Sequence, residues 1–172
     1  MNDLRIETER LIITHFDESM IESVHQNSLD KDVREFVPDE VFETINEAEN
    51  TVRFLIQCYE GNTGPFVYPI LLKNNENIGY VQAVPLENGE WEVGYHIAQS
   101  HTRNGYATEA LLAFIPVILE RLSVPNIWGV CRSDNKASLR VLEKCSFILQ
   151  EKNAMNYHGA KHEVCKYLYS VM

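Results

Sequence analysis

The chain has 172 residues, of which 45% are hydrophobic and 23% charged, so its size and composition are those of one globular domain. Its formal net charge of −10 argues against nucleic-acid binding, because a phosphate backbone requires a basic surface. The sequence lacks a run of about 20 apolar residues and a secretory signal, so we expect a cytoplasmic protein without membrane contact.

The charge is unevenly spread along the chain. Residues 1–60 contain 5 Lys or Arg and 15 Asp or Glu, whereas residues 100–152 contain 7 and 5. An acidic first third favours a cationic partner, and a mildly basic later region tolerates an anionic ligand. The alternative interpretation is that the acidic excess only keeps the protein soluble. Four scattered cysteines without a CxxC pair indicate reduced, packed thiols, and we expect no catalytic or metal-binding cysteine.

The first sixty residues combine strand and helix patterns. Residues 4–16 are rich in β-branched residues and predict a first strand. A capped helix follows, with Asp17 or Ser19 near its start, while residues 30–42 fit no single pattern. Residues 46–61 have apolar positions at helical spacing and predict a second helix.

Three strands are predicted in the middle of the chain, over residues 65–74, 77–87 and 90–99. The last two are separated by Asn88–Gly89, which is the strongest hairpin signal in the sequence. Short turns between consecutive strands predict an antiparallel meander.

The remaining elements complete an α+β layout. A helix is expected over 105–122, in which Pro116 should kink or interrupt the helix. The elements predicted after it are a buried strand (126–133), a short helix (135–145) and a closing hairpin of two strands (147–157 and 161–170). No linker or repeat divides the sequence, so residues 1–172 are expected to form a single domain.

The segment Gln99–Glu109 lies between a predicted strand and a predicted helix. Backbone N–H groups at a helix N-terminus are free, and the helix dipole there favours negative charge. Gly105 lets the backbone approach a ligand closely. The segment therefore suits a pyrophosphate, although it has neither P-loop nor Rossmann spacing and is by itself equally an ordinary turn.

Three stretches in order give this chain a family resemblance: ETERLIITHFDE near the start, GYHIAQSHTRNGYATEAL, and SDNKASLRVLEKCSF. They resemble the GNAT superfamily of N-acetyltransferases, in the branch that includes the ribosomal-protein N-terminal acetyltransferases. The resemblance implies acetyl-coenzyme A (acetyl-CoA) as cofactor. It also implies a mixed, mostly antiparallel seven-stranded sheet, flanked by helices and splayed between its fourth and fifth strands.

The resemblance also implies which residues bind the cofactor. The backbone amides of 103–108 would hold the pyrophosphate, the end of strand 90–99 would pair with the pantetheine arm, and Arg103, Lys136 and Lys144 would supply cations near the phosphates. Carried over position by position, the cofactor-binding set is His96, Ile97, Ala98, Thr102, Arg103, Asn104, Gly105, Tyr106, Ala107, Thr108, Asn135, Lys136, Ser138 and Lys144.

The sequence departs from the family pattern at several positions. Thr102 stands where the family has Gln or Arg, and Arg103 stands where the family often has Gly. Both changes matter little if backbone amides bind the ligand. Ser146 replaces the Gly of a Lys–x–Gly–Phe segment, which is expected to alter the chain's path. Leu142 occupies the place of the tyrosine that many members use as general acid, so that acid is missing.

Acetyl transfer to an amine requires the neutral amine. Removing a proton at pH 7 costs about 1.4 kcal/mol for an N-terminal amine and about 4.6 kcal/mol for lysine. Glu92 is the candidate general base because its strand leads into the cofactor site, with Glu90 and Glu151 as weaker candidates, although each is equally a solvated strand carboxylate. A backbone N–H near Ile97 is the candidate oxyanion donor.

Ser138 is the candidate group for protonating or stabilising the departing thiolate, with pantetheine binding or helix capping as alternative roles. His96 shares a strand face with Glu92, so it either lines the amine channel or is structural. No pair of histidines is accompanied by the further ligand residues that a metal site requires, and we predict no metal.

The predicted reaction is direct attack of a primary amine, from a protein N-terminus, peptide or small molecule, on acetyl-CoA in a ternary complex. Residues 28–42 and the closing hairpin would contact this acceptor. The alternative is a non-catalytic module that binds acetyl-CoA. Relatives are often dimers, so a homodimer is an open alternative.

Overall fold

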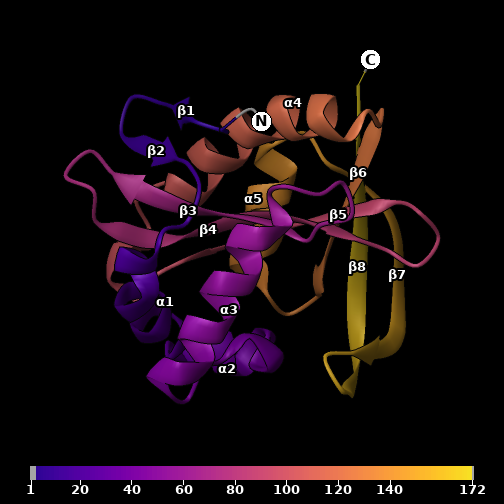
Figure 1. Cartoon of the computed structure of the whole chain (residues 1–172). Helices are drawn as coiled ribbons and strands as arrows, with labels where there is room; N and C mark the ends of the chain where they lie inside the picture. Colours follow the sequence, from indigo (N-terminus) through magenta and orange to yellow (C-terminus); the bar gives the residue numbers. More distant parts are fainter. Residues whose placement is uncertain (1–2, 172) are drawn as a thin grey trace.

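The computed structural model describes residues 3–171 and contains one open sheet with helices on both faces (Figure 1). Its strand order is β1-β2-β3-β4-β5-β6-β8-β7, and every neighbouring pair is antiparallel except β5 and β6. The strands are β1 (Ile6–Glu7), β2 (Leu11–Ile13), β3 (Phe66–Leu72), β4 (Asn77–Pro85), β5 (Trp91–Ile97), β6 (Asn126–Arg132), β7 (Ile148–Tyr157) and β8 (Ala160–Ser170). The predicted α+β class is confirmed.

The sheet has eight strands where the sequence predicted seven, because residues 4–16 form a hairpin instead of one strand. Thr8 makes the turn: its backbone N–H donates to the Leu11 carbonyl (3.0 Å), and its hydroxyl oxygen accepts from the Leu11 N–H (2.9 Å). A side chain that bonds its own backbone three residues on stabilises a turn against extended structure. The prediction missed this turn.

Five helices cover the two faces of the sheet: α1 (Ile21–Ser28), α2 (Lys31–Phe36), α3 (Ile45–Cys58), α4 (Tyr106–Leu122) and α5 (Lys136–Lys144). Helices α1 to α3 lie together on one face, and α4 lies across the other (Figure 1). Thr44 and Glu47 form a capping box that fixes the start of α3. The ambiguous residues 30–42 contain α2 and a 3₁₀ turn, Pro38–Glu40.

Pro116 was predicted to kink or interrupt its helix, and the interruption is wrong, because α4 continues through this residue. A proline inside a helix leaves the carbonyl four residues earlier without its donor, here that of Leu112. Both Pro116 and Leu112 lie on the exposed side of α4, where water can bond the free carbonyl. The opposite side of the helix, with Leu111, Phe114 and Ile118, is fully buried against the sheet.

Ser146 was expected to alter the chain's path after α5, and the structure shows why it does not. The residue adopts the left-handed φ of 68° that a glycine would supply. The Phe147 N–H then bonds the Leu142 carbonyl (3.0 Å), which closes the helix end. A serine therefore holds a glycine conformation here at some conformational cost.

All four cysteines are free thiols, as predicted, and three of them are buried. Among the described residues, no helix has the length and apolarity required to cross a membrane.

Candidate active site

The sheet splits between β5 and β6, at the predicted position. These parallel strands pair only at Glu92 with Trp128 and at Val93 with Gly129, although β5 continues to Ile97 and β6 to Arg132. Beyond this short seam the strands diverge. The edges of β5 and β6 that face each other there are left unpaired.

The backbone of β5 determines which groups face this opening. Antiparallel partners exchange hydrogen bonds at alternate residues, and the Ala98 N–H bonds the Ile78 carbonyl of β4 (2.7 Å). His96 lies two residues before Ala98, so its backbone N–H and C=O groups also point to β4. Tyr95 and Ile97 therefore direct their N–H and C=O groups into the opening. His96, Ile97 and Ala98 were predicted to pair with the pantetheine arm, and of these only Ile97 directs its backbone groups into the opening. Tyr95 was not predicted.

The loop after β5 leads directly into the N-terminus of α4. Gly105 precedes the helix with a left-handed φ of 79° and no side-chain cap, so the first-turn N–H groups of Tyr106, Ala107 and Thr108 are free for a ligand. Arg103 also has a left-handed φ, of 66°. This is the position where the family often has glycine.

Polar side chains of the same loop bond its own backbone. The Thr102 hydroxyl donates to the Gln99 carbonyl (2.9 Å), and the Asn104 amide donates to the carbonyls of His101 (3.0 Å) and Thr102 (3.2 Å). These side chains fix the loop's shape, while its outward backbone amides remain available. The dipole of the 17-residue helix α4 adds positive potential at the same point.

The β1–β2 turn holds this loop from outside, a contact that the sequence reasoning missed. The Arg10 guanidinium donates to the Asn104 carbonyl (2.9 Å), lies 4.5 Å from the centre of the Tyr106 ring, and pairs with Glu109 (2.5 Å). Glu109 also accepts from the Thr8 hydroxyl (2.6 Å). No local pattern could predict contacts between residues about one hundred positions apart.

Helix α5 lies across the opening from β5. Its N-cap is Asn135, whose side-chain oxygen accepts from the Ser138 N–H (3.2 Å). The other end lies beside the first turn of α4, because the Cys145 thiol contacts the Thr108 carbonyl (3.8 Å). Lys144 is therefore near the loop. Lys136 is one helix length away, about 12 Å, and its ammonium donates to the Ser133 carbonyl (2.8 Å).

Ser138 belongs to a small hydroxyl cluster beside the opening. The Tyr95 hydroxyl lies 2.9 Å from both the Ser138 hydroxyl and the Ser138 carbonyl. Burial raises the pKa of the Cys131 thiol to about 11, and a hydrogen bond from Ser138 opposes this shift. Leu142 is buried over Gly129, where an added Cβ would lie 2.5 Å from its side chain. It packs the core and offers no acid.

Glu92 lies at the seam where the opening begins. Burial raises the pKa of its carboxyl to about 7, the nearby Lys166 ammonium opposes the shift, and the Glu40 carboxylate adds to it. A carboxyl group with this pKa exchanges protons readily near neutral pH. Of the two other candidates, Glu151 is paired with Lys166 (3.1 Å), and Glu90 accepts from the Asn88 side-chain amide in the β4–β5 turn.

Glu40 was not predicted, yet it shares this side of the sheet with Glu92. Its carboxylate accepts from the Tyr80 hydroxyl and from the Gln82 amide (3.4 Å), and burial raises its pKa. Asp39 lies beside it and pairs with His158 of the β7–β8 turn. The structure thus gathers acidic groups from β5 and from one of the two predicted acceptor segments, residues 28–42, and the other segment adds His158.

Tyr157 was also missed by the sequence reasoning. Its hydroxyl donates to the Val130 carbonyl (3.3 Å) at the edge of the opening. Burial raises the pKa of this hydroxyl, and the Glu92 carboxylate adds to the shift. Tyr157 is therefore a neutral hydroxyl close to Glu92.

His96 points away from the opening, toward the start of α2. Its Nε2 is 3.4 Å from Asp30 and its Nδ1 3.6 Å from Asp32. The three side chains are close enough to share a cation, a juxtaposition that the sequence did not predict. The Asp30 oxygen nearest His96, Oδ2, also accepts from the Gln99 N–H (2.8 Å), which ties α2 to the end of β5.

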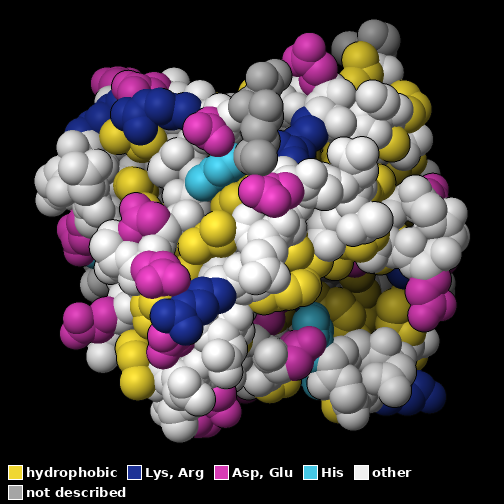
Figure 2. All heavy atoms as spheres, in the orientation of Figure 1, with side chains coloured by type: hydrophobic (Ala, Val, Ile, Leu, Met, Phe, Trp, Pro, Cys, Tyr) yellow, Lys and Arg dark blue, Asp and Glu magenta, His cyan; other side chains and the backbone are white. Residues whose placement is uncertain are grey.

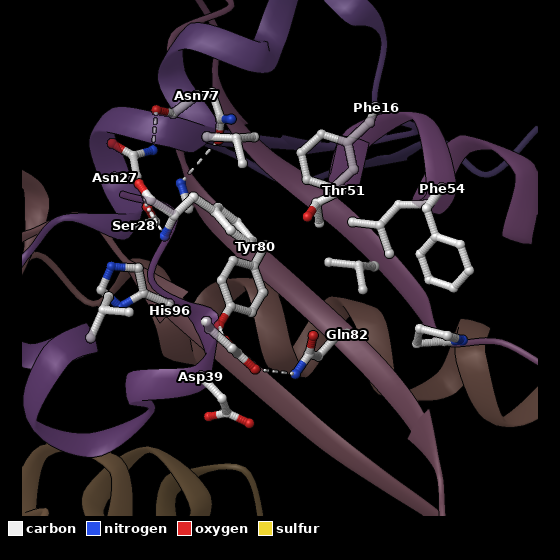
Figure 3. Close-up of a pocket in the computed structure, with 18 of the residues that line it drawn as sticks. Phe16, Asn27, Ser28, Asp39, Thr51, Phe54, Asn77, Tyr80, Gln82 and His96 are labelled. Atoms are coloured by element: carbon white, nitrogen blue, oxygen red, sulfur yellow. Dashed lines mark hydrogen bonds between the residues drawn. The ribbon is translucent and has the colours of Figure 1, made fainter. Parts of the chain in front are cut away.

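A cavity of about 440 Å³ adjoins the acidic groups, between the α1–α3 layer and the sheet. Asp39, Tyr80, Gln82 and His96 lie toward one end of the view in Figure 3, and Phe16 and Phe54 lie at the other. Figure 2 shows a recess with hydrophobic side chains in its depth and a histidine at its edge on this side of the molecule.

Comparisons with known proteins agree with this geometry. Residues 10–148 match the family described as Acetyltransferase (GNAT) domain. The uncharacterized N-acetyltransferase YjdG of Bacillus subtilis is 34% identical over 112 residues, covering 55% of this chain and 67% of that protein.

Two solved structures share the fold. A GNAT-family acetyltransferase from Bacillus anthracis superposes with a TM-score of 0.83 at 23% identity, covering 97% of this chain and 98% of that one. RimL, a ribosomal α-N-protein acetyltransferase in complex with coenzyme A, gives a TM-score of 0.84 at 23% identity, with 98% of each chain covered.

Proposed function

The chain belongs to the GNAT acetyltransferase family and is an acetyl-CoA-dependent N-acetyltransferase, and we propose that it acetylates a primary amine by direct attack in a ternary complex. The observation that carries this proposal is the placement of Glu92, a carboxyl group with a pKa of about 7, at the seam from which β5 and β6 diverge. The acidic groups lie on one side of this seam and the free backbone amides on the other.

The groups on the amide side fit acetyl-CoA. The unpaired backbone of Tyr95 and Ile97 suits an extended pantetheine arm, which can bond the strand edge as a further strand would. The free amides after Gly105 suit a pyrophosphate. Lys144 adds positive charge beside the same loop, whereas Lys136 is too distant to do so.

Acetyl-CoA supplies a thioester whose acyl carbon is open to a nucleophile. Glu92 would take the proton that the amine loses, directly or through one water molecule. The Tyr95 N–H, which also faces the opening and lies two residues nearer Glu92 than the predicted Ile97 N–H, would donate to the oxygen that gains negative charge. The paired hydroxyls of Ser138 and Tyr95 would return a proton to the sulfur as the carbon–sulfur bond breaks, leaving the amide and free thiol as products.

The acceptor is proposed to be a primary amine that reaches Glu92 from the side of Asp39 and Glu40. These carboxyl groups favour an approaching ammonium, and they belong to residues 28–42, one of the two segments predicted to contact the acceptor. The structural likeness to RimL supports a protein N-terminus as one such amine.

The test is release of the coenzyme A thiol over a panel of polyamines, amino acids, aminoglycosides, monoamines and N-terminal peptides. Wild type is run beside Glu92→Gln and Ser138→Ala, with acetyl-CoA affinity measured for each. Release with one acceptor class that is lost in Glu92→Gln, at unchanged cofactor affinity, supports transfer with Glu92 as base. Retained activity in Glu92→Gln would remove that role.

A further inference from the structure

The cavity beside the acidic groups has two chemically different ends. Phe16, Leu55 and Val67 form its apolar end together with Phe54, a phenylalanine of α3 that is 52% exposed. The acidic end contains Asp39 and Glu40. An exposed aromatic side chain at the rim of an apolar cavity is typical of a binding site.

Three other polar residues along the cavity already have partners within the protein, whereas Nε2 of His96 is buried without a hydrogen bond. The Asn27 amide donates to the Asn77 carbonyl (3.1 Å), and Asn77 in turn donates to the Ser23 hydroxyl (3.0 Å). The Ser28 hydroxyl accepts from the Phe42 N–H (3.0 Å). These groups require no hydrogen bond from a ligand, so a ligand there needs few polar atoms of its own.

The charged groups favour a single ammonium at one end only. Glu40 and Asp39 are carboxyl groups, and among the described residues that line the cavity none is Lys or Arg. Glu40 also lies close enough to Glu92 to raise its pKa, so an ammonium beside Glu40 is near the proposed base. Figure 3 shows Gln82 and Tyr80 between this end and the two phenylalanines.

We infer that the acceptor is an amine joined by a short link to a bulky apolar group, with the apolar group in the 440 Å³ cavity and the amine at Glu40. The inference rests on the proposed function and names its substrate class. A free hydrophobic monoamine and a peptide with a hydrophobic first residue share this chemistry. Polyamines and aminoglycosides do not, because their further charges would enter the apolar end.

The experiment compares amines that share one ammonium and differ only in apolar size: ethylamine, 3-methylbutylamine and 2-phenylethylamine, with spermidine as the polycation. A parallel series of tetrapeptides differs only in a first residue of Gly, Leu or Phe. We expect kcat/KM to rise at least tenfold from the smallest to the largest member in one or both series. Equal values within each series, or a preference for spermidine, would overturn the inference.

A second measurement does not depend on acetyl transfer. Without cofactor, 2-phenylethylamine is expected to raise the melting temperature, and ethylamine at the same concentration is not. This outcome would support the cavity's role even if no amine released thiol, a result that would sink the proposed function alone. Equal shifts for both amines would contradict the inference whatever the kinetics show.

A matched pair of variants on α3 locates the effect. Thr51→Phe places a ring into the cavity and is expected to lower the preference for 2-phenylethylamine over ethylamine at least tenfold. Gln57→Phe places the same ring on the exposed side of the helix and should leave the preference unchanged. An unchanged preference in a folded Thr51→Phe protein would exclude this cavity as the binding site.

Discussion

The two sides of the β5–β6 opening are built in different ways. The amide side uses mainly backbone groups from one continuous stretch, β5 to the first turn of α4, and side chains such as Thr102 and Asn104 only fix its shape. The acidic side uses side chains from distant segments: Glu40 before α3, Glu92 in β5 and Tyr157 in β7. A backbone site tolerates many sequences, whereas a side-chain site depends on each residue.

The largest expected effect of this difference is on catalysis. Glu92→Gln should lower kcat/KM about 10²- to 10³-fold at pH 7.5, because the proposed base is removed. Wild-type activity should rise with pH to a plateau above about pH 7, as the Glu92 carboxyl loses its proton. Initial rates from pH 5.5 to 9 test this prediction. A pH profile retained in the variant would assign the ionisation to another group.

The same substitution should stabilise the protein. Below pH 4.5 the Glu92 carboxyl holds its proton in both the folded and the unfolded chain. Between pH 4.5 and about 7 only the unfolded chain loses it, so the folded state becomes less stable as pH rises. Glu92→Gln should therefore raise the free energy of unfolding by about 3 kcal/mol at pH 8.

Urea unfolding at pH 8 and pH 4.5 measures this effect, and the gain should vanish at the lower pH. An equal gain at both pH values would trace it to packing instead of ionisation.

A smaller effect is expected from Glu40→Gln. Glutamine can still accept from the Tyr80 hydroxyl but carries no charge, so KM for the amine should rise about tenfold. Acetyl-CoA affinity should stay within about twofold, since the cofactor is proposed to bind the amide side. Weakened acetyl-CoA binding would show that the two sides are not separate.

The smallest effects are expected at two non-glycine residues with a left-handed φ, Arg103 on the amide side and Ser146 after α5. Arg103→Gly and Ser146→Gly should each raise the free energy of unfolding by about 1 kcal/mol, because glycine adopts a left-handed φ without strain. Acetyl-CoA affinity of Arg103→Gly should change less than threefold if backbone amides bind the phosphates. A tenfold loss would give the Arg103 guanidinium a direct role.

The difference between the two sides also explains which features of the fold and the site could be predicted from the sequence. The succession of strands and helices after residue 45 and the loop around Gly105 were predictable, because hydrophobic period, turn residues and a strand–glycine–helix pattern are local. The splayed position was predicted from the family resemblance alone. Glu40 and Tyr157 carry no local signal, since their neighbours come from other parts of the chain. Arg10 was missed for the same reason. Pro116 was misjudged because its exposure depends on how α4 packs.

The short seam between β5 and β6 has a mechanical consequence. Two paired positions join strands β1–β5 to strands β6–β8. Separating these two parts therefore breaks fewer backbone hydrogen bonds than separating the long strands on either side of the seam. A ligand bonded along both edges of the opening would act as a clasp between them. Amide hydrogens of β6 and β8 should then exchange more slowly with acetyl-CoA bound, although no residue of β8 need contact it.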